Sequence, residues 1–94
     1  MAFPDPAYVL QLKYFDNESW LYVSQGLILD SKELKDNLKY FTFANLKEPE
    51  LLAQKVVRQR EGMVEMYKII KLSRFPPHPE FSVERYQKYK KPKQ

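Results

Sequence analysis

The apolar positions between residues 46 and 62 repeat with the period of an α-helix. At 100° per residue, six apolar side chains fall within an arc of roughly 140°, and these are Leu46, Pro49, Leu52, Ala53, Val56 and Val57. Pro49 suits a first helical turn, where its missing N–H costs little, and Gly62 suits a left-handed helix end. The pattern predicts an amphipathic helix over Lys47–Gly62, capped near Asn45 or Lys47, whose apolar face packs on a sheet.

Alternating apolar and polar positions before this helix predict a β-hairpin. Ala7–Phe15 and Ser19–Gln25 are rich in aromatic and aliphatic residues, and Asp16-Asn17-Glu18 supplies turn residues between them. A two- or four-residue loop pairs Phe15 with Trp20, Lys13 with Tyr22 and Leu12 with Val23. In this register the face toward the helix carries Tyr8, Leu10, Leu12, Tyr14, Leu21 and Val23. The opposite face carries Gln11, Lys13, Phe15, Trp20 and Tyr22.

The segment between the hairpin and the helix shows weaker patterns. Leu27-Ile28-Leu29 fits a short strand, and Asp30 or Ser31 can cap a short helical turn that runs through Asn37. Lys39–Phe43 has the aromatic content of a strand, but it is short and leads directly into the helix.

Met63–Phe75, after the helix, is predicted as a third long strand. Its even positions Val64, Met66, Ile70 and Leu72 are expected to face the core, despite Lys68. Pro76-Pro77-His78-Pro79 then ends regular pairing and is interpreted as a rigid spacer or, alternatively, a Pro-x-x-Pro ligand. Ser82–Tyr89 is expected to form a helical turn or two.

Together these elements predict the α+β class. We expect an antiparallel sheet of three to four strands, built from a β-hairpin, a short helical turn, one main amphipathic helix and a return strand, with the helix on one face. Residues 1–81 are expected to form a single compact domain. Residues 82–94 are expected to form a basic C-terminal tail that is partly disordered.

The charge of the chain is concentrated in that tail. The net charge of the 94 residues is +4, and residues 1–81 contain equal numbers of basic and acidic side chains. The tail therefore carries the whole excess, as an arm rather than as a basic face on the domain. The absence of cysteine fits a reducing compartment, and the N-terminal residues do not resemble a signal peptide. These features predict a soluble cytoplasmic protein.

The composition argues against an enzyme. One histidine and no cysteine leave no basis for a metal cluster or a cysteine–histidine nucleophile, and two glycines cannot build a phosphate-binding loop. The isolated His78 is interpreted as an exposed loop residue. We therefore expect no catalytic residues, no metal site and no cofactor.

The outer hairpin face is the first candidate binding surface. Lys13, Phe15, Trp20 and Tyr22 give it the aromatic-rich composition of protein interfaces. The alternative is that residues 75–89 fold across these rings and form a second small core with them.

The tail is a second candidate surface, because it interleaves cations for phosphates with rings for base stacking. Its candidate nucleic-acid-binding residues are Arg85, Tyr86, Lys88, Tyr89, Lys90, Lys91 and Lys93. The alternative is a solubilising tail whose tyrosines pack back onto the domain. A homo-oligomer formed through the sheet face or an edge strand is a further alternative.

Four segments resemble small proteins of unknown function encoded by bacteriophages of Gram-positive bacteria. They are Tyr8–Val23, Leu38-Lys39-Tyr40-Phe41-Thr42, Leu51–Val57 and Tyr67–Leu72. The resemblance implies a phage accessory role in the cytoplasm of a host bacterium, such as inhibition of a bacterial defence system, and it implies no catalytic residues.

The sequence thus predicts a small non-enzymatic protein that binds a macromolecular partner, either a protein or a ribonucleoprotein. The alternative is a nucleic-acid-binding module that uses the basic C-terminal arm.

Overall fold

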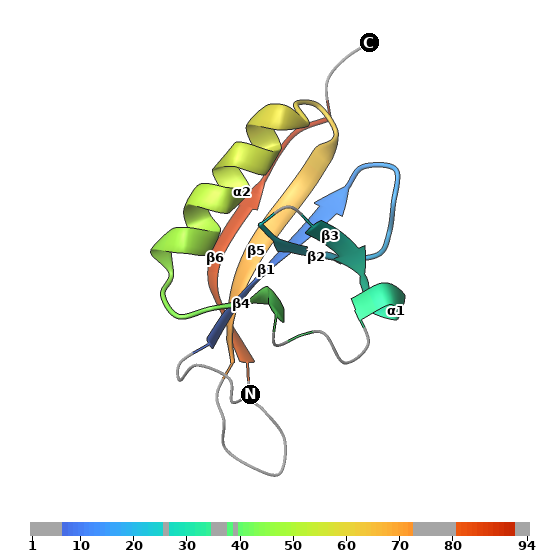
Figure 1. Ribbon diagram of the computed structural model, residues 1–94. Coiled ribbons are helices and arrows are strands. Elements are labelled where there is room, and N and C mark those ends of the chain that lie inside the picture. The colour runs from blue at the N-terminus through green and yellow to red at the C-terminus, as the bar shows by residue number, and fades with distance from the viewer. Residues whose placement is uncertain (1–6, 26, 35–37, 39, 73–80, 92–94) are drawn as a thin grey trace.

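The computed structural model describes residues 7–25, 27–34, 38, 40–72 and 81–91. Within these residues, six strands and two helices follow one another (Figure 1). In order they are β1 (Ala7–Tyr14), β2 (Leu21–Ser24), β3 (Leu27–Asp30), α1 (Ser31–Leu34), β4 (Thr42–Phe43), α2 (Lys47–Gln59), β5 (Val64–Leu72) and β6 (Phe81–Lys88).

The strands form one antiparallel sheet in the order β3-β2-β1-β5-β6, and β4 pairs with the N-terminal end of β1. The α+β class and the single main helix are confirmed. The expected number of three to four strands was too low, because both β4 and β6 belong to the sheet. The helical turns expected over Ser82–Tyr89 are wrong, since this stretch lies largely within β6, the strand that pairs with β5.

Helix α2 begins at the predicted residue, Lys47, and ends at Gln59, three residues before the predicted end at Gly62. The side-chain oxygen of Asn45 accepts a hydrogen bond of 2.9 Å from the Glu48 N–H, and Pro49 is buried in the first turn. The Arg60 N–H bonds the Val56 carbonyl, and Gly62 follows with a φ of 82°. Because a side chain is disfavoured at positive φ, a glycine there lets the chain reverse directly into β5.

The β1–β2 hairpin has the predicted faces but a different register. The pairs are Leu10 with Val23, Gln11 with Tyr22 and Leu12 with Leu21, two positions away from the expected pairing. A shift of two residues leaves each side chain on its face, because side chains alternate with a period of two. Leu10, Leu12, Leu21 and Val23 therefore reach the core under α2, as expected.

The prediction for the core face of β5 was wrong. Tyr67 and Ile69, at odd positions, pack in the core under α2, whereas the even positions that follow Val64 lie on the other face. Val64 still reaches the core because the register with β1 shifts between Lys13 and Tyr14. The physical reason is that β5 is a central strand with apolar residues on both faces, so that Ile69 and the neighbouring Ile70 are both buried.

The remaining predictions have mixed outcomes. Strand β3 is present over Leu27–Asp30, and the Asp30 carboxylate caps α1 by accepting a 2.8 Å hydrogen bond from the Glu33 N–H. Of the predicted stretch Lys39–Phe43, the described part contains the short strand β4 over Thr42–Phe43. The expectations for Asn37, Lys93, the proline cluster and His78 concern residues outside those that the structure describes.

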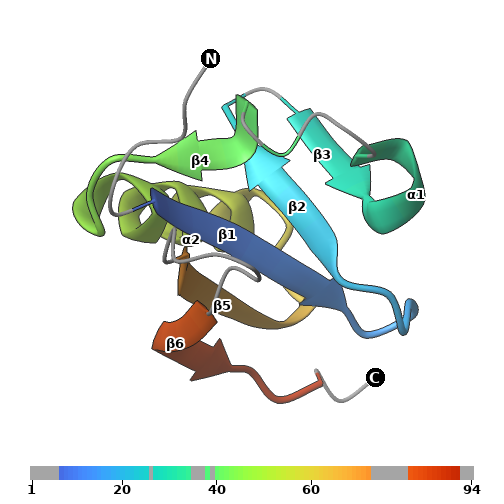
Figure 2. The same ribbon diagram turned by 90° about the horizontal axis from the view of Figure 1, so that it is seen from below.

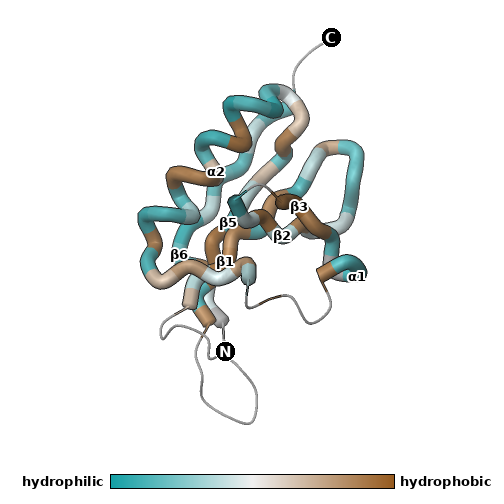
Figure 3. The backbone as a smooth tube through the Cα atoms, viewed as in Figure 1, coloured by the Kyte–Doolittle hydropathy of each residue, from teal (hydrophilic) through white to brown (hydrophobic). Residues whose placement is uncertain are grey.

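Helix α2 covers only part of the sheet. It packs against β1 and β5, while the β2–β3 hairpin extends to the side (Figures 1 and 2). The hydropathy along the chain follows this arrangement, since the strands under the helix are mostly apolar and α2 alternates between apolar and polar turns (Figure 3). The face of the sheet opposite α2 is called the outer face below.

Candidate functional site

The outer face carries a row of side chains that crosses four strands. The register pairs Tyr22 with Gln11, Gln11 with Lys68 and Lys68 with Tyr86. Directly opposed residues of antiparallel strands point to the same side of a sheet. Tyr22, Gln11, Lys68 and Tyr86 therefore form one line on the outer face, which we name the central row.

Two further lines flank the central row. One consists of Lys13, Met66 and Lys88, and the other of Val9, Ile70 and Val83. Val83 and Tyr86 are both more than half exposed, whereas Val9 and Ile70 are buried. The outer face is therefore buried around Val9 and Ile70 and exposed to solvent along β6.

A groove of about 460 Å³ lies on this face beside the central row. Its floor contains the buried Val9, Gln11 and Ile70, and its sides include Trp20, Tyr22 and Lys68. The ammonium nitrogen of Lys68 lies 4.2 Å from the centre of the Trp20 ring, a cation–π contact. This contact joins β5 to the residue that precedes β2, and it places a cation and an indole ring side by side at the groove.

Gln11 is the polar group at the base of the groove. It is only 8% exposed, and its side-chain amide makes no hydrogen bond within the described part of the chain. An amide at the base of a groove can both donate and accept hydrogen bonds. A ligand group that offers both an acceptor and a donor would satisfy it.

The charges on the outer face are mainly positive. Lys13 is neutralised by Glu65, whose carboxylate oxygen lies 2.8 Å from the ammonium nitrogen. Among the described residues, Lys68 and Lys88 have no carboxylate within ion-pair distance. Glu18 is the acidic residue among those that line the groove. Two cations therefore remain available beside the aromatic rings.

The structure brings together part of each surface that the sequence nominated. Lys13, Trp20 and Tyr22 of the hairpin lie on the same face as Tyr86 and Lys88 of β6. Phe15 lies just beyond β1, where its N–H bonds the Met63 carbonyl, and it does not line the groove. The described residues that follow Leu72 extend the sheet as β6 and do not form a second core across the rings.

Two of the nominated tail residues face the helix instead. Tyr89 packs against the core with its ring centre 6.4 Å from that of Tyr67, and Arg85 lies 3.8 Å from the Glu50 carboxylate of α2. Burial raises the pKa of both tyrosines, and for Tyr67 the nearby Tyr89 and Glu50 raise the pKa further while Arg85 lowers it. Lys90 and Lys91 are exposed, and Lys93 lies outside the described residues.

Sequence reasoning missed Lys68, and it placed Gln11 on the outer face without nominating it as a binding residue. Lys68 was treated as an exception on a core face, because the face of β5 was assigned incorrectly. The signal for Lys68 was present, since a lysine in the middle of an apolar strand rarely points into a core. Gln11 carried no such signal, because its burial depends on residues from three other segments of the chain.

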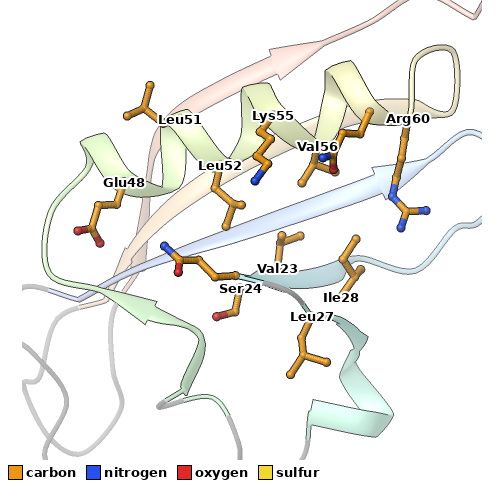
Figure 4. Close-up of a pocket in the computed structure, with 12 residues that line it drawn as sticks. Val23, Ser24, Leu27, Ile28, Glu48, Leu51, Leu52, Lys55, Val56 and Arg60 are labelled. Atoms are coloured by element: carbon orange, nitrogen blue, oxygen red, sulfur yellow. The ribbon is translucent and has the colours of Figure 1, made fainter.

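A second and larger groove of about 870 Å³ lies between α2 and the β2–β3 hairpin. Leu52 and Val56 of the helix point toward Val23 and Ile28 of the hairpin across it, with Lys55 above them (Figure 4). This is the part of the inner face that α2 leaves uncovered. Its rim has an acidic end at Glu48 and basic side chains elsewhere, so its charge pattern selects no single occupant.

No described group of three or more histidine, aspartate or glutamate side chains could hold a metal ion. Within the described residues, no helix is both long and apolar enough to cross a membrane. Comparisons of the chain with protein-family models, curated proteins and solved structures found no match. The geometry of the outer face is therefore the main indication of function.

Proposed function

We propose that the chain is a non-enzymatic protein that binds a macromolecular partner through the outer face of its sheet. The observation that carries this proposal is the central row, which joins Tyr22 and the exposed Tyr86 through Gln11 and Lys68. An exposed ring and a half-buried ring beside a cation have the composition of binding hot spots. The groove adds the Gln11 amide at its base, a group that could hydrogen-bond to a ligand.

The proposal is tested by affinity capture from a bacterial lysate with the full chain as bait. Captured protein and captured nucleic acid are measured separately, with and without nuclease. We expect Tyr86→Ala to weaken binding, and with it capture, by roughly tenfold, which corresponds to a loss of about 1.4 kcal/mol of binding free energy. The double variant with Trp20→Ala should capture no more than Tyr86→Ala does.

The matched control removes apolar surface elsewhere. Leu51→Ala together with Met63→Ala truncates two residues that are each at least half exposed and do not belong to the rows of the outer face. This control is expected to capture as much as the parent chain. Equal capture by the parent and by folded Tyr86→Ala, checked by circular dichroism, would contradict the proposal.

A further inference from the structure

We infer that the partner of the outer face is a single-stranded nucleic acid. This inference rests on the proposed function and specifies its ligand. The binding face combines residues that lie far apart in the sequence, because β6 brings Tyr86 and Lys88 onto the face that already holds Trp20 and Tyr22. An open antiparallel sheet with rings and cations on one face is an established way to bind unpaired bases, two or three of which can stack on such a face.

The rings are spaced to contact more than one base. Tyr22 and Tyr86 lie three strands apart in the central row, so their backbones are separated by roughly 14 Å at about 4.8 Å per strand. Trp20 lies on the β2 side, with its ring against Lys68. Bases stack on such rings without regard to their identity, since every base has an aromatic face. One base at Tyr86 and another near Trp20 would therefore leave the linking phosphates above the centre of the sheet.

Cations lie where those phosphates would pass. Lys68 occupies the centre of the central row and Lys88 the adjacent line, and neither is neutralised by a carboxylate within the described chain. Lys90 and Lys91 continue from β6 as exposed side chains. A phosphate backbone is the chemical match for uncompensated cations interleaved with rings, whereas an apolar protein surface would leave them buried without partners.

Gln11 supplies a group that can contact a base edge. Its amide offers one acceptor and two donors, it lies in the floor of the groove, and it has no hydrogen-bond partner among the described residues. The edge of a nucleobase presents complementary donors and acceptors when the base is not paired. A duplex hides these edges and the faces of its bases, so the geometry selects single strands over duplex.

The direct test is binding of the full chain to fluorescently labelled 12-mer oligouridine and oligothymidine, measured by anisotropy at low salt. A 12-base-pair duplex serves as the structural control. We expect the single strands to bind more tightly than the duplex and to quench the emission of Trp20, the only tryptophan of the chain. With three phosphates contacted, log Kd should rise with log salt at a slope of roughly 2.

Two matched pairs of variants assign the site. Tyr86→Ala should weaken binding roughly 5- to 100-fold, as expected for the loss of one stacked base, while Tyr86→Phe should bind like the parent chain. Lys88→Glu and Lys55→Glu change the net charge equally, but Lys55 lies on α2 away from the outer face. Lys88→Glu should weaken binding at least tenfold, and Lys55→Glu should have a much smaller effect.

Gln11→Leu tests base contact separately from stacking and charge. The substitution removes the amide at nearly constant size and should reduce the preference among oligouridine, oligocytidine and oligoadenine, which a merely structural role would not alter. Equal weakening by Lys88→Glu and Lys55→Glu, or equal affinity for strand and duplex, would overturn the inference, since either indicates nonspecific charge attraction.

The two proposals fail in different ways. If no oligonucleotide binds at low salt, but lysate capture depends on Tyr86 and resists nuclease, the partner is a protein. The nucleic-acid inference is then overturned and the proposed function stands. If capture also proves independent of Tyr86, both are overturned.

Discussion

Lys68 lies at the centre of the outer face because β5 is packed on both sides. Ile69 is buried in the core and Ile70 on the opposite side, so the alternation of the strand gives Lys68 the one direction in which its ammonium can reach solvent. There it meets the Trp20 ring at 4.2 Å. The Lys68 side chain thus connects the central strand β5 to Trp20, at the turn end of the β1–β2 hairpin.

Tyr14 is a residue whose hydroxyl group is not satisfied. The hydroxyl is buried without a hydrogen-bond partner in the described chain, although the Arg60 guanidinium lies 5.9 Å from the centre of the ring. Tyr14→Phe removes the unsatisfied group and keeps the ring. We expect the free energy of unfolding, measured by urea denaturation, to rise by about 1 kcal/mol.

The exposed Tyr86 provides the control for that measurement. Tyr86→Phe removes a hydroxyl group from a side chain that is 55% exposed, and it should change the unfolding free energy by less than about 0.5 kcal/mol. A loss of stability in Tyr14→Phe would show that the hydroxyl has a partner in solution.

At the scale of elements, the hairpin, the main helix and the short strand β3 could be predicted, whereas the edge strand β6 could not. The faces of β1 and β2 were correct despite the wrong register, because an error of two residues preserves alternation. The prediction for the core face of β5 was wrong because a strand that is buried on both sides shows no alternation of apolar and polar residues. β6 was missed because its mixture of charges and rings fits an exposed helix turn as well as an edge strand.

The sequence predicted residues of the candidate site only as two separate surfaces. Trp20 and Tyr22 were nominated from the hairpin, and Tyr86 and Lys88 from the tail. Their union depends on the pairing of β5 with β6, which local sequence patterns do not encode. Register across distant strands is set by tertiary packing rather than by propensity.

β6 also protects the edge of β5, and this function can be tested by truncation. Removing residues 81–94 exposes the nine residues of β5 as an edge that contains Ile69 and Ile70. Unpaired apolar edges recruit other strands. We expect the truncated chain to self-associate in light scattering. Removal of residues 90–94 alone should leave the scattering unchanged, since β6 ends at Lys88.

At the scale of the whole molecule, Tyr67 and Tyr89 couple stability to alkaline pH. The pKa of Tyr67 is raised above 10.0, first by burial, and burial also raises the pKa of Tyr89. The folded state therefore holds these protons more tightly than the unfolded chain does. Their contribution to stability is fully present below pH 10 and is lost as the pH rises through the folded-state values.

We expect the free energy of unfolding to decrease between pH 9 and pH 11, as measured by urea denaturation at each pH. Tyr67→Phe should make this decrease smaller, because one of the groups with a raised pKa is removed. Tyr86→Phe, at an exposed position, should show the same decrease as the parent chain. Identical pH profiles for Tyr67→Phe and the parent would contradict the assignment.

The central row draws on both halves of the chain, because Tyr22 and Gln11 lie before α2 whereas Lys68 and Tyr86 follow it. During synthesis on a ribosome the first two residues emerge long before the last. The hairpin alone therefore carries only half of the row. Binding through this row, as proposed above, requires the closing strand β6 to have left the exit tunnel and docked, so we expect a nascent or prematurely terminated chain to compete poorly with the finished protein for the same ligand.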